Sequence, residues 1–142
     1  MSAAEAYDIR SVDRGEVLRY LGYAGQALSP ELDGRIDETV ARCLGIARPA
    51  GCVRVFDVSG VAEKDGVPVI GLEGTALELR GHSIAEHLEG ALAVGVLAVT
   101  LGMGAELELR RLSLTDRVGQ VVFDAAGSAL VERAADAAEA RV

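Results

Sequence analysis

Three acidic residues in the last third of the chain recur every eight positions: Asp116, Asp124 and Glu132. Paired carboxylates perform acid–base hydrolysis only when they flank the same bond. On a helix of 3.6 residues per turn, a step of eight residues turns the side chain by about 80°, so these three wind around the helix. The spacing argues against a hydrolase site. The alternative is local: Asp116 caps a helix, and Asp124 pairs with Arg117 or Gln120.

The histidines and cysteines do not have the spacing of a metal site. His82 and His87 flank Glu86, but they are five residues apart and would lie on different faces of a helix, whereas zinc-binding pairs are four apart. Cys43 and Cys52 match no metal or redox motif. They indicate that Cys43 lies in the core and that Cys52 lies at the start of a strand. Both are expected to be free thiols in a cytoplasmic protein. We therefore predict neither a metal site nor a catalytic nucleophile.

A glycine-rich turn follows the most apolar stretch, in the run Thr100-Leu101-Gly102-Met103-Gly104. A strand that turns through glycines into a helix N-terminus can hold an anion or the edge of a cofactor on free backbone amides. The run lacks the third glycine of a dinucleotide fingerprint, and no acidic residue ends a following strand. The alternative is a tight turn whose glycines allow close packing.

The elements that must position these residues can be read from hydrophobic spacing and end signals. The two N-terminal helices are opened by Asp13 and by Ser29-Pro30, and Ser83 with Glu86 forms a capping box for a short third helix. Strands are expected over 52–58, 67–70, 75–79 and 91–99, with a turn at 64–66, and further helices over 105–112 and from 113–115 towards the end. The run over 91–99 is typical of a central strand covered on both faces. The order predicts an α+β fold: a small, mostly antiparallel sheet packed with helices.

The final helix carries apolar residues on two sides, which predicts a long central helix. One stripe comprises Leu114, Val118, Val121, Ala125, Ala129 and Glu132, and Phe123 and Leu130 lie nearly opposite. Glu132 is the exception in its stripe. A carboxylate there either reaches water at a frayed helix end or is held for a purpose.

Composition excludes several classes of protein. The net charge is −8 and no stretch clusters Lys or Arg with aromatic residues, so nucleic acid is not an expected partner. The N-terminus is acidic, unlike a signal peptide. The longest uncharged run, over 90–105, is shorter than the ~20 residues that span a bilayer, so no membrane segment is expected. The 142 residues predict a single domain.

Together these residues resemble the activation domain of cobalamin-dependent methionine synthase, and most closely its short, stand-alone members. The resemblance extends from about residue 13 to 136. It is carried by Glu16 to Tyr23, Gly74 to His82, Thr100-Leu101-Gly102, Arg111, Ser113, Asp116, Asp124-Ala125, Ser128 and Glu132.

The resemblance implies a specific function. Members of the family bind S-adenosylmethionine and present its methyl group to the reduced cobalamin of a partner, either methionine synthase or another corrinoid-binding protein, which restores methylcobalamin. Catalysis would consist mainly of positioning. Glu132 matches the family's acidic residue that approaches the cationic end of S-adenosylmethionine. Thr100, Gly102, Asp116 and Asp124 are the other expected cofactor-binding residues.

The sequence departs from the family in one respect. A later segment of the type Arg-Pro-x-x-Gly-Tyr, which makes the main ligand contacts in the family, is missing, and Arg48-Pro49 is followed by no tyrosine. Either the chain is part of a longer protein or the ligand loop has been lost. The alternative function is a non-catalytic interaction module, serving as a docking surface for a corrinoid protein or as half of a homo-oligomer. A small-molecule enzyme built on the glycine turn is a third possibility, for which the sequence offers no nucleophile or base.

Overall fold

The computed structural model describes residues 3–142 and has the predicted α+β fold, with five helices and a five-stranded antiparallel sheet. The described chain divides into two compact units. The first comprises the residues up to Cys52 together with Ala98–Arg141, and the second comprises Val53–Leu97 with Val142.

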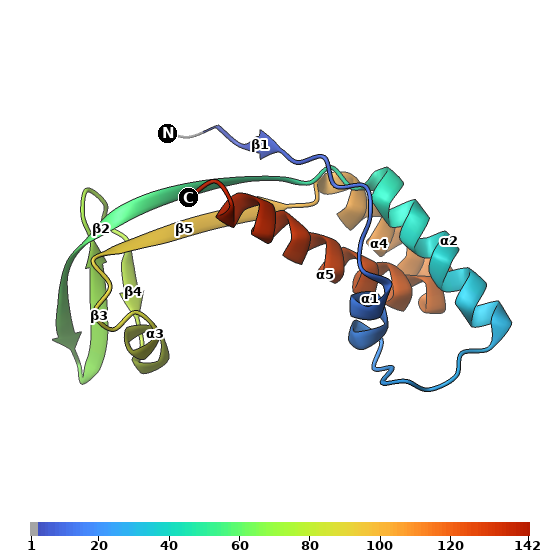
Figure 1. Ribbon diagram of the computed structural model, residues 1–142, viewed down its shortest axis with the longest axis horizontal. Helices are drawn as coiled ribbons and strands as arrows, with labels where there is room; N and C mark the ends of the chain where they lie inside the picture. Colours follow the sequence, from blue (N-terminus) through green and yellow to red (C-terminus); the bar gives the residue numbers. More distant parts are fainter. Residues whose placement is uncertain (1–2) are drawn as a thin grey trace. The chain divides into compact units, whose positions relative to one another are not determined.

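The first unit is mainly helical. It contains β1 (Glu5–Ala6), α1 (Arg14–Tyr20), α2 (Pro30–Ile46), α4 (Met103–Thr115) and α5 (Arg117–Glu139). Figure 1 shows α1, α2 and α4 grouped around α5, and each of the three packs against it. The predicted helix starts are confirmed: the Asp13 carboxylate accepts a hydrogen bond from the Gly15 amide, and the Ser29 hydroxyl accepts one from the Leu32 amide.

Helix α5 is the centre of this unit, which confirms the predicted long central helix. Its buried residues are Gly119, Val122, Phe123, Ala125, Ala126, Ala129, Leu130, Ala134 and Ala138. They contribute to three separate apolar clusters, shared with α2 and α4, with α1 and α2, and with the segment around Tyr7. Because most are alanine or glycine, the neighbouring helices can approach α5 closely.

The predicted apolar stripe of α5 is only partly correct. Ala125 and Ala129 are buried, but Val118 and Val121 are half exposed. Leu114 belongs to the preceding helix and is 88% exposed. The helix also starts later than predicted, because α4 continues to Thr115 and a separate N-cap intervenes before α5.

The second unit is built on a hairpin. It contains most of β2 (Ala50–Lys64) and β5 (Ala93–Thr100), with β3 (Val67–Leu72), β4 (Glu78–Arg80) and α3 (His82–His87). Strands β2 and β3 pair from Lys64 opposite Val67, and the turn between them uses positive φ at Asp65 (54°) and Gly66 (77°), as a tight hairpin requires. Figure 1 shows α3 beside β3 and β4, which it contacts. In the sheet as a whole, β2 also pairs with β1 and β5.

Four details of the strand and cap predictions are wrong. Strand β5 is not covered on both faces, because Val94 is its only buried residue. Helix α3 begins one residue before Ser83 and has no side-chain cap; Gly81, with a φ of 136°, precedes it. Strand β2 is more than twice as long as expected, whereas β4 is reduced to three residues.

Candidate functional site

Glu132 lies on α5 against the end of α1, which brings together two segments 112 residues apart. The hydroxyl of Tyr20 donates a hydrogen bond to Oε1 of the Glu132 carboxylate. The guanidinium of Arg19 lies 3.9 Å from the same oxygen and is itself held by Glu16 at 2.7 Å. Arg19 also lies over the Tyr20 ring, 4.6 Å from its centroid. The carboxylate is therefore oriented on one oxygen by two neighbouring side chains of α1.

This arrangement changes the proton affinity of Tyr20. The hydrogen bond to Glu132 raises the pKa of the tyrosine hydroxyl above its usual value, because ionisation would place two anions side by side. At neutral pH, Tyr20 therefore remains a donor, and its proton stays directed at the Glu132 carboxylate.

Glu132 also lines a surface hollow of about 760 Å³ between α5, α1 and the segment before α1. Five carboxylates and one guanidinium line it: Asp8, Asp13, Glu16, Glu132, Asp136 and Arg133. Three of the acids have partners of their own, since Asp8 pairs with Arg10, Asp13 caps α1 and Glu16 pairs with Arg19. We call this the acidic hollow. Its charge suits a small cation.

Gly102 and Asp124 meet at a second, smaller hollow of about 310 Å³ between α4 and α5. Its wall is mainly apolar, with Leu101 and Phe123 among the lining residues. Thr100 ends β5, and its hydroxyl accepts a hydrogen bond from the Gly102 amide at 3.0 Å, which stabilises the turn. Gly102 has a φ of 85°, a backbone conformation that favours glycine.

Asp116 lines neither the acidic hollow nor the smaller one. It is the N-cap of α5: its carboxylate accepts a hydrogen bond from the Gly119 amide at 3.0 Å and forms an ion pair with Arg35 of α2. The Gly119 amide, and then Arg35, hold the pKa of Asp116 below its usual value. This is the capping role that the sequence left open. The five expected cofactor-binding residues thus lie in three places rather than in one site.

The comparisons with known protein families and curated proteins identify no relative of this chain. No family model matches the chain, and no curated protein matches it. The functional argument therefore depends on the residues and their geometry.

A buried carboxylate held by two half-exposed arginines was not anticipated from the sequence. The Glu108 side chain on α4 is only 8% exposed, and its carboxylate contacts Arg42 of α2 at 2.7 Å and Arg111 at 2.6 Å. Hydrogen bonds from Arg111, and then from Arg42, lower the pKa of Glu108 to about 2. The spacing of Glu108 and Arg111 on one helix is a sequence signal for that contact. Nothing in the sequence points to Arg42, which is 66 residues away.

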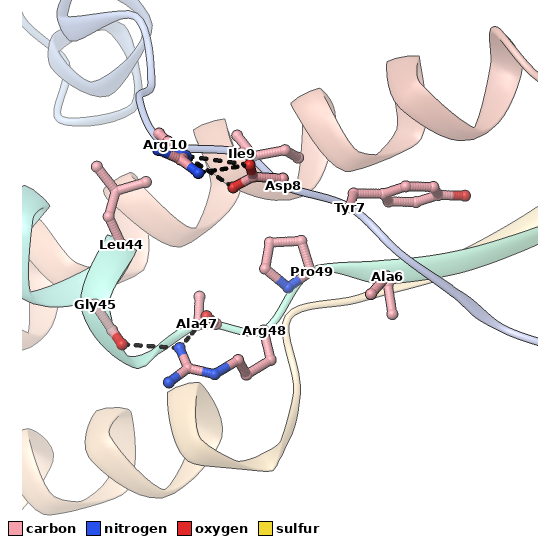
Figure 2. A pocket seen from close by; sticks show the side chains of 11 residues that line it. Ala6, Tyr7, Asp8, Ile9, Arg10, Leu44, Gly45, Ala47, Arg48 and Pro49 are labelled. Carbon is pink, nitrogen blue, oxygen red and sulfur yellow. Dashed lines mark hydrogen bonds and ion pairs between the residues drawn. The ribbon is translucent and has the colours of Figure 1, made fainter.

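A further hollow of about 540 Å³ lies between the N-terminal segment and the end of α2 (Figure 2). In it, Arg48 folds back so that its guanidinium donates to the carbonyls of Gly45 and Ala47, each at 2.9 Å. This contact satisfies carbonyls at the end of α2. Asp8 and Arg10 form an exposed pair at the other wall, as Figure 2 shows. These contacts stabilise a helix end and a loop.

The remaining titratable candidates are separate from these places. His82 and His87 are exposed at the two ends of α3. Cys43 is buried in the core beside α5, and burial raises the pKa of its thiol to about 11; Cys52 is half-buried in β2. Within residues 3–142, no group of three or more possible ligands could hold a metal ion. No helix in that part of the chain is both long enough and apolar enough to cross a membrane.

Proposed function

We propose that this chain is an activation-domain-like protein that supports S-adenosylmethionine-dependent reductive remethylation of the cobalamin of methionine synthase or a related corrinoid methyltransferase. The observation that carries the proposal is the contact between Tyr20 and Glu132. Both residues belong to segments on which the resemblance to the family depends, and they meet beside the acidic hollow.

The charge of the acidic hollow supports a cationic ligand. S-adenosylmethionine carries a sulfonium and an ammonium, and both are attracted by carboxylates. In the described chain, both contacts of the Glu132 carboxylate are made to Oε1. The other oxygen, Oε2, is then the acceptor for the ligand's ammonium, while Tyr20 keeps the carboxylate in place.

The protein's own residues would orient the ligand. S-adenosylmethionine supplies the methyl group, and the reduced cobalamin of the partner supplies the nucleophile. Glu132 fixes the amino-acid end of the ligand, and Asp136, one turn further along α5, adds negative charge to the same hollow. Gly102 and Asp124 line a separate, mainly apolar hollow between α4 and α5, so Glu132 and the acidic hollow carry this proposal alone. The reaction belongs in the cytoplasm, and the free thiols of Cys43 and Cys52 fit a reducing compartment.

The proposal is tested by calorimetric titration of the chain with S-adenosylmethionine. We expect binding, and we expect Glu132→Gln to weaken it by about tenfold or more, because a charge-assisted hydrogen bond is lost. Glu139→Gln is the matched control, since it removes the same charge from an exposed position on α5 outside the hollow. S-adenosylhomocysteine, which lacks the sulfonium charge, should bind more weakly.

Two results would contradict the proposal. One is the absence of heat or saturation with S-adenosylmethionine for the folded wild-type chain. The other is an equal affinity of the Glu132→Gln and Glu139→Gln variants. The partner step is tested separately, by adding the chain to an inactivated corrinoid methyltransferase with reductant and S-adenosylmethionine and following the cobalamin absorption spectrum.

A further inference from the structure

Helix α4 presents an apolar stripe to solvent on the side opposite its core face. Met103, Leu107 and Leu114 are 65%, 58% and 88% exposed. At about 100° per residue, these three side chains lie within about 40° of one another around the helix. Leu112, on the other side of the helix, is buried. An outward stripe of large apolar side chains on a short helix indicates an interaction surface.

The spacing of this stripe is that of a helix-pairing seam. Met103, Leu107, Arg110 and Leu114 follow one another at intervals of four, three and four residues. These are the intervals between core positions of two packed helices. The pattern also reads the same in both directions. Two copies of α4 laid antiparallel would therefore match, with Met103 opposite Leu114 of the second copy and Leu107 opposite Arg110.

The charges along α4 favour the same arrangement. Glu106 lies beside the first half of the stripe and Arg110 lies in its second half, whereas Arg111 is already held by the buried Glu108. In an antiparallel pair, Arg110 of each copy lies over Leu107 of the other copy, within reach of the other copy's Glu106. In a parallel pair, the two Arg110 side chains would face each other and repel. The exposed Glu106–Arg110 contact within the helix, at 3.0 Å, would become part of a four-charge network.

We propose that the outward face of α4 is the contact of a two-fold symmetric, antiparallel homodimer. A second copy is the occupant because the four positions of the seam, Arg110 included, and the charges beside them each match a second copy laid antiparallel, as an isologous interface requires. The proposal is independent of ligand binding. With 13 residues, α4 is only about 20 Å long, so the interface falls in the small, transient class. We expect a dissociation constant on the order of 100 µM.

Sedimentation equilibrium between about 10 µM and about 1 mM brackets this dissociation constant and tests the proposal. We expect a concentration-dependent monomer–dimer equilibrium, which Leu107→Lys weakens by at least about tenfold, because it places a cation opposite Arg110 of the second copy. Val121→Lys is the matched control: Val121 is also 58% exposed, but it lies on α5. This variant should dimerise like the wild type.

Cysteine cross-linking tests the direction of the helices in a Cys52→Ser background. The double variant Met103→Cys/Leu114→Cys should form a disulfide-linked dimer. Each single variant should not, because identical positions are about 16 Å apart in the antiparallel pair. Glu106→Arg and Arg110→Glu should each weaken the dimer, and their combination should restore it.

Several outcomes would overturn the proposal. A chain that is monomeric at about 1 mM has no such dimer. Equal association of the Leu107→Lys and Val121→Lys variants would place the contact elsewhere. Efficient cross-linking of the single Met103→Cys variant would indicate parallel helices. Circular dichroism identifies any variant that fails to fold, and the result for that variant is excluded. The cross-linking experiment then tests the proposal by itself.

Discussion

The buried carboxylate of Glu108 offers a quantitative test of the electrostatics in the helical unit. Its ordinary pKa is 4.5, and Arg111 and Arg42 lower it to about 2 in the folded protein. A difference of about 2.5 pKa units corresponds to ~3.4 kcal/mol of stability at neutral pH. The two arginine side chains are 53% and 54% exposed, so solvent screening reduces this value. We expect Glu108→Gln to lower the free energy of unfolding by about 2 kcal/mol at pH 7.

The pH dependence of this effect follows from the direction of the shift. Above the unfolded-state pKa of 4.5, the carboxylate is charged in both the folded and the unfolded chain, so the wild type keeps its full advantage over Glu108→Gln. As the pH falls from 4.5 towards about 2, the unfolded chain takes up the proton before the folded chain does. The difference between wild type and variant should therefore be constant above about pH 5.5 and shrink towards zero near pH 2.

Urea unfolding followed by circular dichroism, repeated from about pH 7 to about pH 2.5, measures this difference across the window in which it changes. Glu106→Gln is the control: it removes an exposed carboxylate of the same helix, whose pair with Arg110 should contribute at most about 0.5 kcal/mol. If the difference in the free energy of unfolding between wild type and Glu108→Gln stays constant down to pH 2.5, the variant has lost a packing contact rather than a charge interaction. Equal stability of the two proteins at pH 7 would refute the electrostatic reasoning altogether.

Three further predictions concern packing and reactivity. Ile36 is fully buried, so Ile36→Ala should lower the free energy of unfolding by about 2–5 kcal/mol in urea. A Cβ at Gly51 would lie 2.8 Å from a backbone carbonyl of β5, so Gly51→Ala should lower the free energy of unfolding by about 1–3 kcal/mol in the same assay. Gly60→Ala is the control: its Cβ would meet nothing within 4 Å, so it should change the free energy of unfolding by at most about 0.5 kcal/mol. Burial raises the pKa of the Cys43 thiol to about 11, so at about pH 8 Cys43 should react with Ellman's reagent far more slowly than the half-buried Cys52. Unfolding in urea should remove this difference, and equal rates in the folded protein would contradict the prediction.

Local signals in the sequence predict much of this fold because they act over a few residues. The Ser29-Pro30 start of α2, the Asp13 cap of α1 and the turn around Gly66 each depend on neighbours within about four positions. The central role of α5 was also predictable, since apolar residues on two sides of a helix require partners on both.

Contacts between distant segments explain what the sequence could not predict. The run over 91–99 has the composition of a covered strand, yet β5 leaves most of its side chains exposed or half exposed, since coverage depends on what packs there. Glu132 stood out from the sequence as a carboxylate in an apolar stripe, but its partner Tyr20 is 112 residues away. Arg35 and Asp116 are 81 residues apart in the chain. Pairings of this kind are set by tertiary packing and leave no local pattern.

The position of α5 in the sequence has a consequence for how the protein is made. The helix contributes to three apolar clusters of the helical unit, but its last residue, Glu139, is synthesised 93 positions after the end of α2 at Ile46. At ~5–20 residues per second, the ribosome needs about 5–20 s to cover that distance. During this time the apolar faces of α1 and α2 have emerged without the helix that covers them. The nascent chain therefore exposes these apolar faces until α5 has been synthesised.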